Sequence, residues 1–321
     1  MTKKIILIVA GDPNSINTEI IYKSWKKIKN SLKEKIIIIG NHNLIVKQFK
    51  KLKYSIKTIK LKNLNEYKKN HYLKILNVDL KFSNPFKVKK INASKYVIKS
   101  LEMAHKISIK KDAIGFINCA IDKKLLLKKN TGVTEFLALK CGIKNNSEVM
   151  LIRNKNLSVV PITTHIDLKN VAKKIKAQNI IKKVKTLNSW FLKYFGRKPK
   201  IAILGLNPHN SEFRSSSEEK TQILPSIKRL KSFKIKIEGP FAADTIFMRN
   251  FKNYDVVVGM YHDQVLAPFK SIFKLNAINI TLGLKYLRVS PDHGTAINLV
   301  LKNEADETSL KECINFINKS F

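Results

Sequence analysis

Short apolar runs that alternate with helical stretches along the whole chain constrain the fold more than any other feature. The clearest runs are 5–9 (Ile-Ile-Leu-Ile-Val), 201–206 (Ile-Ala-Ile-Leu-Gly-Leu) and 256–260 (Val-Val-Val-Gly-Met). A strand that is apolar at successive positions is buried on both faces, which is typical of a parallel sheet between layers of helices. The sequence therefore predicts an α/β fold with largely parallel sheets covered by helices.

The same alternation gives approximate positions for the elements. Strands are expected at 4–10, 35–40, 54–61, 112–118, 148–153, 157–161, 200–206, 254–260 and 277–282. Helices are expected at 18–31, 43–52, 92–109, 134–141, 168–195, 217–231, 291–301 and 308–319. A chain of 321 residues suits one large domain or two of moderate size, and no Gly/Ser-rich linker marks a boundary.

The charge of the chain is strongly positive, with 62 Lys and Arg against 23 Asp and Glu and a net charge of +39. Such a balance first suggests a nucleic-acid partner. However, nearly all of the basic residues are lysines spread along the whole chain, whereas nucleic-acid recognition favours arginine for its bidentate contacts. An AT-rich coding sequence produces the same richness in Lys, Ile and Asn. We therefore expect no nucleic-acid partner.

The cysteines and the apolar segments indicate a cytoplasmic protein. Cys119, Cys141 and Cys313 lie far apart without metal-type spacing, which suggests buried thiols in a reducing compartment. The N-terminal apolar run is too short for a signal peptide and ends in the turn Gly11-Asp12-Pro13. No apolar stretch approaches the ~18 residues that a membrane span needs, so we expect no membrane partner.

Three histidines stand in similar contexts: His165 follows Val160-Pro161, whereas His209 and His262 come after apolar runs. In open α/β sheets, ligands bind outside the carboxyl ends of the strands. Imidazole is the commonest metal ligand, and three protein ligands with one open position are the usual catalytic arrangement. One such histidine alone would more often be structural, but the set of three predicts a divalent metal site.

A second group of polar residues lies between the last expected strands. It contains Lys270, Asn279, Arg288 and the run Asp292-His293-Gly294-Thr295. Taken alone, Asp292-His293-Gly294 is equally well interpreted as a capped helix entry. The chain has no G-x-G-x-x-G after any strand, so the usual dinucleotide fingerprint is absent.

These motifs resemble the PdxA family, the 4-hydroxythreonine-4-phosphate dehydrogenases of pyridoxal phosphate biosynthesis. The resemblance runs in family order over nearly the whole chain. Its residues are Gly11-Asp12-Pro13 with Glu19, Lys123, Gly132 with Thr134-Glu135, Val160-Pro161 with Thr163-Thr164-His165, Asn207-Pro208-His209, Glu218-Glu219, Gly239-Pro240 with Ala243-Asp244-Thr245, Tyr261-His262-Asp263-Gln264, Lys270 and 279–295. The Asn-Pro-His, Tyr-His-Asp-Gln and Asp-His-Gly-Thr-Ala elements are the most specific.

The resemblance implies two α/β domains of the isopropylmalate-dehydrogenase type. In this arrangement, 1–125 plus 265–321 form a domain that contains both termini, and 126–264 form a domain that carries the metal site and the dimer contacts. The resemblance further implies a homodimer whose active site is completed across the subunit interface.

The resemblance also assigns roles to residues. It implies a divalent cation (zinc, magnesium, manganese or cobalt) held by ligands drawn from both subunits, and NAD or NADP as the hydride acceptor. The metal ligands are His165, His209 and His262, the substrate contacts are Thr134, Lys270, Asn279 and Arg288, and the stretch that meets the nucleotide is Asp292-His293-Gly294-Thr295.

The implied reaction is the metal-dependent, NAD(P)-linked oxidation of 4-phosphooxy-L-threonine. The product, 2-amino-3-oxo-4-phosphooxybutanoate, decarboxylates to 3-amino-2-oxopropyl phosphate. A Lewis-acidic metal suits this chemistry because it stabilises an alkoxide without a strong base. Lys270 and Arg288 supply positive charge for the substrate's phosphate or carboxylate, although Lys270 could instead relay a proton.

The chain departs from the family pattern at several positions. The family has Gly-His-Thr-Glu where this chain has Gly132-Val133-Thr134-Glu135, and the family's glycines are missing from 14–19 and 210–215. Drift in an AT-rich genome and a change in substrate or rate both explain these departures. The alternative to the family reaction is therefore a dehydrogenase for a related phosphorylated hydroxy acid, or a degenerate member with weak activity.

Overall fold

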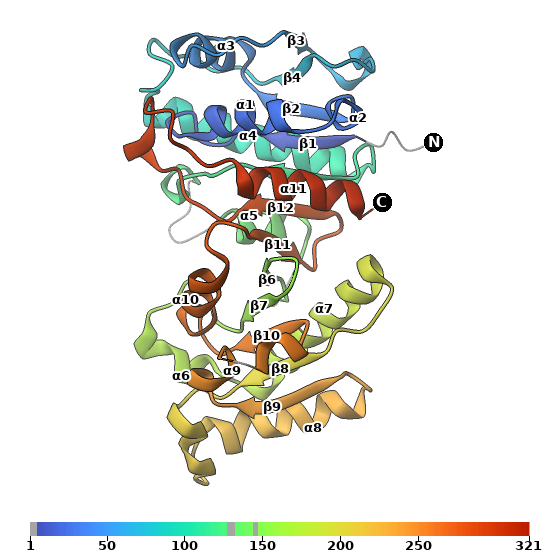
Figure 1. The fold of residues 1–321 in the computed structure, drawn as a ribbon, viewed down its shortest axis with the longest axis vertical. Helices are drawn as coiled ribbons and strands as arrows, with labels where there is room; N and C mark the ends of the chain where they lie inside the picture. Colours follow the sequence, from blue (N-terminus) through green and yellow to red (C-terminus); the bar gives the residue numbers. More distant parts are fainter. Residues whose placement is uncertain (1–4, 127–131, 144–146, 249, 321) are drawn as a thin grey trace. The chain divides into compact units, whose positions relative to one another are not determined.

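Buried parallel strands form the centre of the first of the two units into which the chain divides, Met1–Cys141 with Leu284–Phe321. The computed structural model describes residues 5–126, 132–143, 147–248 and 250–320 (Figure 1). In unit 1 the strand order is β3–β4–β2–β1–β5–β12, and all neighbours are parallel. The strands are β1 (Ile6–Val9), β2 (Ile36–Gly40), β3 (Thr58–Leu61), β4 (Leu73–Asn77), β5 (Gly115–Asn118) and β12 (Leu287–Pro291).

The helices of unit 1 cover this sheet. α4 packs against β1, β2 and β5, and α11 packs against β12, β1 and β5 and also against α1. The side chain of Asn41 caps α3 by accepting the amide hydrogen of Leu44 at 2.9 Å. The helices are α1 (Asn17–Lys27), α2 (Asn30–Lys33), α3 (His42–Lys51), α4 (Lys90–Ile109), α5 (Val133–Lys140) and α11 (Thr308–Lys319).

In unit 2, Gly142–Gly283, the strand order is β11–β6–β7–β10–β8–β9. β7, β10, β8 and β9 are parallel neighbours, whereas β6 is antiparallel to both β11 and β7. The strands are β6 (Val149–Arg153), β7 (Ser158–Pro161), β8 (Ile201–Leu204), β9 (Ile237–Phe241), β10 (Val256–Gly259) and β11 (Ile278–Leu282).

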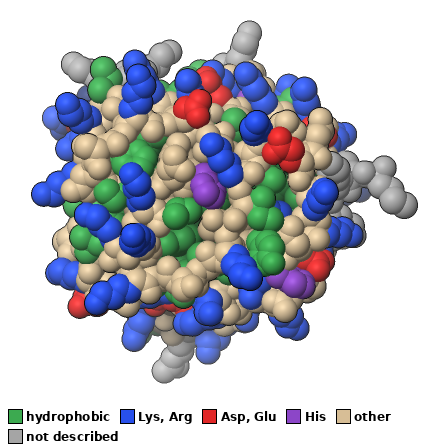
Figure 2. Space-filling model, turned by 90° about the horizontal axis from the view of Figure 1, so that it is seen from above, with side chains coloured by type: hydrophobic (Ala, Val, Ile, Leu, Met, Phe, Trp, Pro, Cys, Tyr) green, Lys and Arg blue, Asp and Glu red, His purple; other side chains and the backbone are tan. Residues whose placement is uncertain are grey.

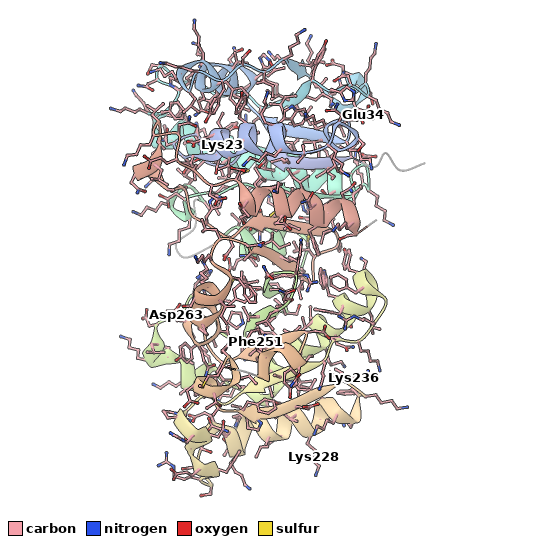
Figure 3. All side chains as sticks on the ribbon, viewed as in Figure 1. Lys23, Glu34, Lys228, Lys236, Phe251 and Asp263 are labelled. Carbon is pink, nitrogen blue, oxygen red and sulfur yellow. The ribbon has the colours of Figure 1, made fainter. Side chains whose placement is uncertain are left out.

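Helices also cover the sheet of unit 2. α10 packs on β7 and β10, α8 packs on β9, and α7 packs on β6 and β11. The core between them contains Val257 and Phe269, which are fully buried, and Phe251, which Figure 3 labels. The helices are α6 (Val171–Lys174), α7 (Ala177–Phe195), α8 (Leu224–Ser232), α9 (Ala243–Ile246) and α10 (His262–Phe273).

The predicted fold class is confirmed, because both units are α/β with mainly parallel sheets under helices. Some elements differ from the expectation. β4, β9, β12 and α10 were not predicted, and the helix expected at 168–195 is interrupted between α6 and α7. The helix expected at 291–301 is wrong: β12 continues to Pro291, and Ala296 and Leu301 then adopt positive φ, which ends any helix.

The two units differ in extent from the expected domains. The first break lies after Cys141 and not after 125, because α5 belongs to unit 1. The second lies after Gly283 and not after 264, because α10 and β11 belong to unit 2.

Positive charge is spread over the surface. Figure 2 shows lysine and arginine side chains distributed across a whole face of the molecule, with acidic and apolar side chains between them. Lys228 on α8 and Lys236 before β9 are exposed in the same way on unit 2 (Figure 3). The three cysteines are buried thiols. Among the helices in the described ranges, none offers an apolar stretch of the length that crossing a bilayer requires.

Candidate functional site

The three candidate metal-binding histidines follow three strands that are neighbours in the sheet of unit 2. His165 comes after β7, His262 begins α10 directly after β10, and His209 comes after β8. The strands are parallel and lie in the order β7–β10–β8. Their carboxyl ends therefore share one edge of the sheet, which is the usual ligand-binding edge of an α/β fold.

The His165–His262 pair fits a metal ion. Their ring centroids are 6.0 Å apart, and two imidazoles on one metal have centroids roughly 5 to 6 Å apart, because each ligating nitrogen lies about 2 Å from the ion. Asp263 Oδ1 lies 2.7 Å from Nδ1 of His262 at the start of α10 (Figure 3). A carboxylate on one ring nitrogen orients an imidazole so that the other nitrogen can bind a metal.

His209 lies in a turn with an unusual backbone. All five residues of 209–213 have φ between 48° and 55°, and none of them is glycine. Left-handed backbone costs non-glycine residues about 1–2 kcal/mol each, so the surrounding contacts must impose this conformation. Within the described part of the chain, no three His, Cys, Asp or Glu side chains are grouped as ligands of one metal.

Two residues to which sequence analysis gave no role hold the ends of these strands. Nε2 of Gln264 donates to the carbonyl of Gly205 at 2.8 Å, and its Oε1 accepts the amide hydrogen of Met260 at 2.6 Å. Glu219 accepts the amide hydrogens of Leu206 and Asn207, both at 2.8 Å. Their place in the Tyr-His-Asp-Gln and Glu-Glu motifs was the available signal, but these contacts depend on the tertiary fold.

The other expected substrate residues of unit 2 are Lys270 and Asn279. Lys270 lies in the last turn of α10. Asn279 lies in β11, and its buried Oδ1 accepts no hydrogen bond from the described residues. A buried acceptor without a partner is costly, so a ligand that donates to this oxygen would stabilise it.

In unit 1 the structure brings Arg288 and Thr134 together. Arg288 is 3% exposed in β12. Its Nε donates to Oδ1 of Asn118 at 2.6 Å, and its Nη1 lies 3.5 Å from Oγ1 of Thr134. Burial lowers the pKa of Arg288 to about 10, so the guanidinium remains charged at neutral pH. Sequence analysis missed Asn118, which gave no motif signal.

Val133 is the first residue of α5 and lies beside Thr134. Gly132 precedes it, and a Cβ there would come within 2.7 Å of Oε2 of Glu135, which is the movable end of a side chain. Gly132, Thr134 and Glu135 of the family's Gly-x-Thr-Glu element are present. Only the imidazole that the resemblance leads one to expect at 133 is missing.

The expected nucleotide loop also lies in unit 1. The carbonyl of Thr295 accepts the amide hydrogen of Ile16 at 3.2 Å, and Oγ of Ser309 accepts that of Asp292 at 2.9 Å. Nε2 of His293 is buried and has no hydrogen-bond partner among the described residues. A Cβ at Gly294 would meet nothing within 4 Å, so there is open space beside this part of the loop.

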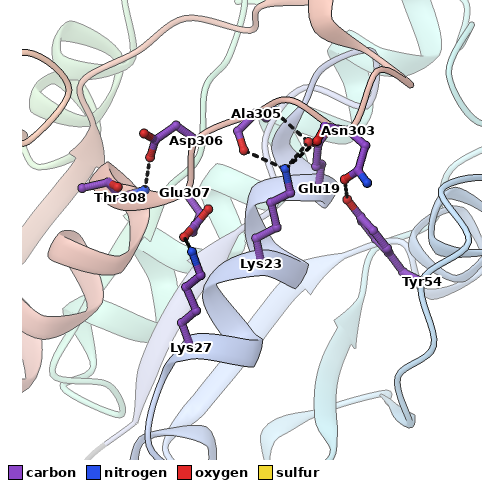
Figure 4. Close-up of polar contacts among 9 residues, drawn as sticks. All are labelled: Glu19, Lys23, Lys27, Tyr54, Asn303, Ala305, Asp306, Glu307 and Thr308. Atoms are coloured by element: carbon purple, nitrogen blue, oxygen red, sulfur yellow. Dashed lines mark hydrogen bonds and ion pairs between the residues drawn. The ribbon is translucent and has the colours of Figure 1, made fainter.

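Helix α1 holds the end of this loop (Figure 4). Nζ of Lys23 donates to the carbonyls of Asn303 and Ala305, both at 2.9 Å, and to Oε1 of Glu19 at 2.8 Å. The same oxygen of Glu19 accepts the amide hydrogen of Ala305 at 2.8 Å. The buried Glu19 therefore orients both Lys23 and the chain that follows the loop.

Comparisons with known proteins show the family of this chain. The sequence pattern of the family described as pyridoxal phosphate biosynthetic protein PdxA matches residues 32–317. The chain belongs to the PdxA family. The 4-hydroxythreonine-4-phosphate dehydrogenase of Sulfurihydrogenibium sp. is 37% identical over 317 residues, which are 96% of each chain. The enzyme of the same name from Aquifex aeolicus is 36% identical over 99% of this chain and 98% of its own.

The fold agrees with that of a solved structure as well. The crystal structure of 4-hydroxythreonine-4-phosphate dehydrogenase from Klebsiella pneumoniae matches with a TM-score of 0.85 and 24% sequence identity. The match covers 99% of this chain and 100% of that one. At this identity, the likeness supports the PdxA fold.

Proposed function

We propose that this PdxA-family chain is the dehydrogenase that oxidises 4-hydroxythreonine 4-phosphate (4-phosphooxy-L-threonine). The proposed product is 2-amino-3-oxo-4-phosphooxybutanoate, which loses CO2 to give 3-amino-2-oxopropyl phosphate. The observation that carries the proposal is the position of His165, His262 and His209 after three adjacent parallel strands. The 37% identity to an enzyme of that name supports the same substrate.

The proposed metal ligands are His165, His209 and His262. The 6.0 Å separation of the first and third rings and the carboxylate of Asp263 on His262 support this assignment. We infer that ligands come from both subunits of a homodimer, because His209 does not join the other two in a group within the described chain. When bound, a divalent cation lowers the pKa of the substrate hydroxyl, and a nicotinamide dinucleotide accepts the hydride.

The chain's own residues bind and orient the substrate in this proposal. Arg288 is buried, charged and fixed by Asn118, so it offers a preorganised site for a phosphate or carboxylate oxygen. Thr134 beside it carries a hydroxyl, a group that both donates and accepts hydrogen bonds. Asn279, with its buried Oδ1, and Lys270 supply the remaining polar groups.

The proposed contact with NAD or NADP is the loop Asp292-His293-Gly294-Thr295. The buried Nε2 of His293 and the open space at Gly294 support it.

A homodimer is part of the same proposal. Unit 2 exposes large apolar side chains: Leu168 is 70% exposed, Met248 74% and Phe213 43%. Contacts with a second copy would cover such side chains. Light scattering should give twice the mass of 36.8 kDa; a monomer at micromolar concentration would contradict the dimer.

A related phosphorylated hydroxy acid is the second candidate substrate, and Val133 favours it. An isopropyl group cannot make the hydrogen bond that an imidazole makes. A substrate without the matching polar group would therefore lose less binding free energy at this position than 4-hydroxythreonine 4-phosphate. Mass spectrometry of the products decides between the two. With 4-hydroxythreonine 4-phosphate and NAD, 3-amino-2-oxopropyl phosphate is expected; product only from another phosphorylated hydroxy acid would replace the assignment.

A further inference from the structure

Two polar side chains fix the loops that carry His209 and His262. The side-chain amide of Gln264 joins the ends of β8 and β10, because it donates to Gly205 and accepts from Met260. Glu219 is 0% exposed and holds the backbone of Leu206 and Asn207, just before the turn of His209. The side-chain amide of Asn207 also donates to Glu219 Oε2 at 3.1 Å.

Glycines at two strand ends make room for these side chains. A Cβ at Gly259 would lie 2.5 Å from Cγ1 of Val265 and 2.9 Å from Oε1 of Gln264, and a Cβ at Gly205 would lie 2.0 Å from Oδ1 of Asn210 and 3.2 Å from Oε1 of Glu219. The chain has only 11 glycines among 321 residues. Glycine is therefore present where the side chains of Gln264 and Glu219 approach the backbone, in a chain that contains few glycines.

The turn 209–213 follows the two residues that Glu219 contacts, and its backbone conformation needs to be held by hydrogen bonds of this kind. Residues 209–213 adopt left-handed backbone without a glycine, although non-glycine residues adopt it as single residues and not in runs. Burial raises the pKa of the Glu219 carboxyl, but the hydrogen bonds from Asn207 and Leu206 outweigh this and lower the pKa below its usual value. The carboxylate is thus ionised at neutral pH and accepts strong hydrogen bonds from the loop.

We propose that Glu219 and Gln264 are positioning residues for the metal ligands His209 and His262. Glu219 fixes the chain that enters the turn of His209, and Gln264 fixes the end of β8 relative to the end of β10, where His262 begins. This inference rests on the proposed metal site and goes beyond it, since neither residue is expected to touch the metal or the substrate.

The test measures metal affinity in purified full-length protein. Co2+ is titrated against a chromophoric chelator, and the visible absorption of bound Co2+ is recorded. Glu219→Gln keeps the size of the side chain and removes the charge. Gln264→Glu keeps the acceptor for Met260 but places a carboxylate oxygen against the carbonyl of Gly205. Glu238→Gln is the matched control, because this carboxylate is exposed on β9 of the same unit.

We expect each of the two variants to raise the Kd for Co2+ about tenfold to a hundredfold. This is the usual effect of losing a residue that orients the metal ligands without touching the metal. The Co2+ spectrum should change, and the control should stay within about twofold of the wild type. Circular dichroism of the metal-free proteins identifies any variant that fails to fold. If one does, the other variant decides.

A double-mutant cycle separates positioning from general stability. If Glu219 acts through His209, Glu219→Gln should cost little further Co2+ affinity in a His209→Ala background. An equal loss in both backgrounds, or wild-type Kd values in both folded variants, would overturn the inference and leave the proposed function standing. A wild-type protein that binds no Co2+ would overturn the metal site and this inference together.

Discussion

Val133 is the residue at which this chain departs most clearly from the PdxA pattern near its candidate site. It begins α5, one position before Thr134, which lies against Arg288. The glycine before it and the glutamate after Thr134 remain, so the backbone can present an imidazole at 133. By the resemblance, what the chain lacks here is one hydrogen-bonding side chain.

Restoring that imidazole is the first prediction. Val133→His should raise kcat/KM for 4-hydroxythreonine 4-phosphate about tenfold to a hundredfold, which corresponds to about 1–3 kcal/mol for one regained contact. Steady-state NADH formation measures it. Unchanged kcat/KM in a folded variant would mean that the chain has adapted to a substrate or geometry without this contact.

Lys74 gives a prediction about stability and pH. It is 1% exposed in β4, and its Nζ donates to the carbonyls of Lys33 and Asn70 at 3.2 and 2.7 Å. Burial lowers the pKa of Lys74 to about 8, although Glu34 opposes the shift. In the unfolded chain a lysine titrates near pH 10.4. Between these values the unfolded state binds more protons, so stability rises with pH.

The free energy of unfolding should therefore rise by about 1–3 kcal/mol more between pH 8 and about 10 in the wild type than in Lys74→Met. Urea unfolding at several pH values measures the difference. Lys60→Met on the neighbouring strand β3 is the control, because Lys60 is exposed and should follow the wild type. Parallel curves for wild type and Lys74→Met would contradict the prediction.

At the scale of the element, the turn 209–213 forms a left-handed backbone without glycine, which requires stabilising contacts from the surrounding chain. The resemblance to the PdxA family leads one to expect glycines after Asn-Pro-His, whereas this chain has Asn210, Ser211, Glu212 and Phe213 at left-handed φ. Four non-glycine residues therefore adopt a conformation that glycine adopts most easily. Contacts such as those of Glu219 with the preceding chain must offset the cost.

Ser211→Gly should stabilise the metal-free protein by about 0.5–1 kcal/mol. Glycine removes the left-handed penalty of about 1–2 kcal/mol but gives the unfolded chain more freedom. Thermal unfolding gives the sign. Ser271→Gly is the matched control: Ser271 is exposed within α10, where glycine should cost about 0.5 kcal/mol. Destabilisation by both substitutions would argue against strain at 211.

The contact between α1 and the chain after the nucleotide loop supports another prediction. Lys23→Met removes three hydrogen bonds from Nζ, two of them to the backbone of Asn303 and Ala305 (Figure 4). Amide hydrogen exchange in 296–305 should become about tenfold faster, because Lys23 holds two backbone carbonyls at the end of this stretch to α1. Lys26→Met on the exposed side of the same helix should leave exchange unchanged. Equal exchange rates in all three proteins would contradict the prediction that Lys23 holds this stretch to α1.

Much of the element pattern could be predicted from the sequence, and the failures have physical causes. β1 and β10 are continuous apolar runs, so they were predicted with small errors at their ends. α10 was missed because it begins with the polar run His262-Asp263-Gln264 and contains Pro268, a residue that disfavours the interior of a helix. The helix expected at 291–301 was wrong because its apolar spacing occurs in a loop with positive φ at Ala296 and Leu301.

At the scale of the whole molecule, the candidate site could be predicted only as a set of residues. Motif order identified the histidines, Arg288 and Thr134. Their supporting contacts come from Asn118, Glu219 and Gln264, whose partners are distant in sequence and thus depend on the fold. The chain has a net charge of +39, and Figure 2 shows lysine and arginine side chains spread over the face that it presents.

The most direct test of the central proposal is NADH formation by the purified protein with 4-hydroxythreonine 4-phosphate and NAD. It is measured before and after treatment with a chelator, and again after divalent metal is added back. We predict turnover that the chelator abolishes and the added metal restores, with His165→Ala and His262→Ala inactive under the same conditions. Absence of turnover in a folded, metal-loaded sample, or turnover that resists the chelator, would contradict the account.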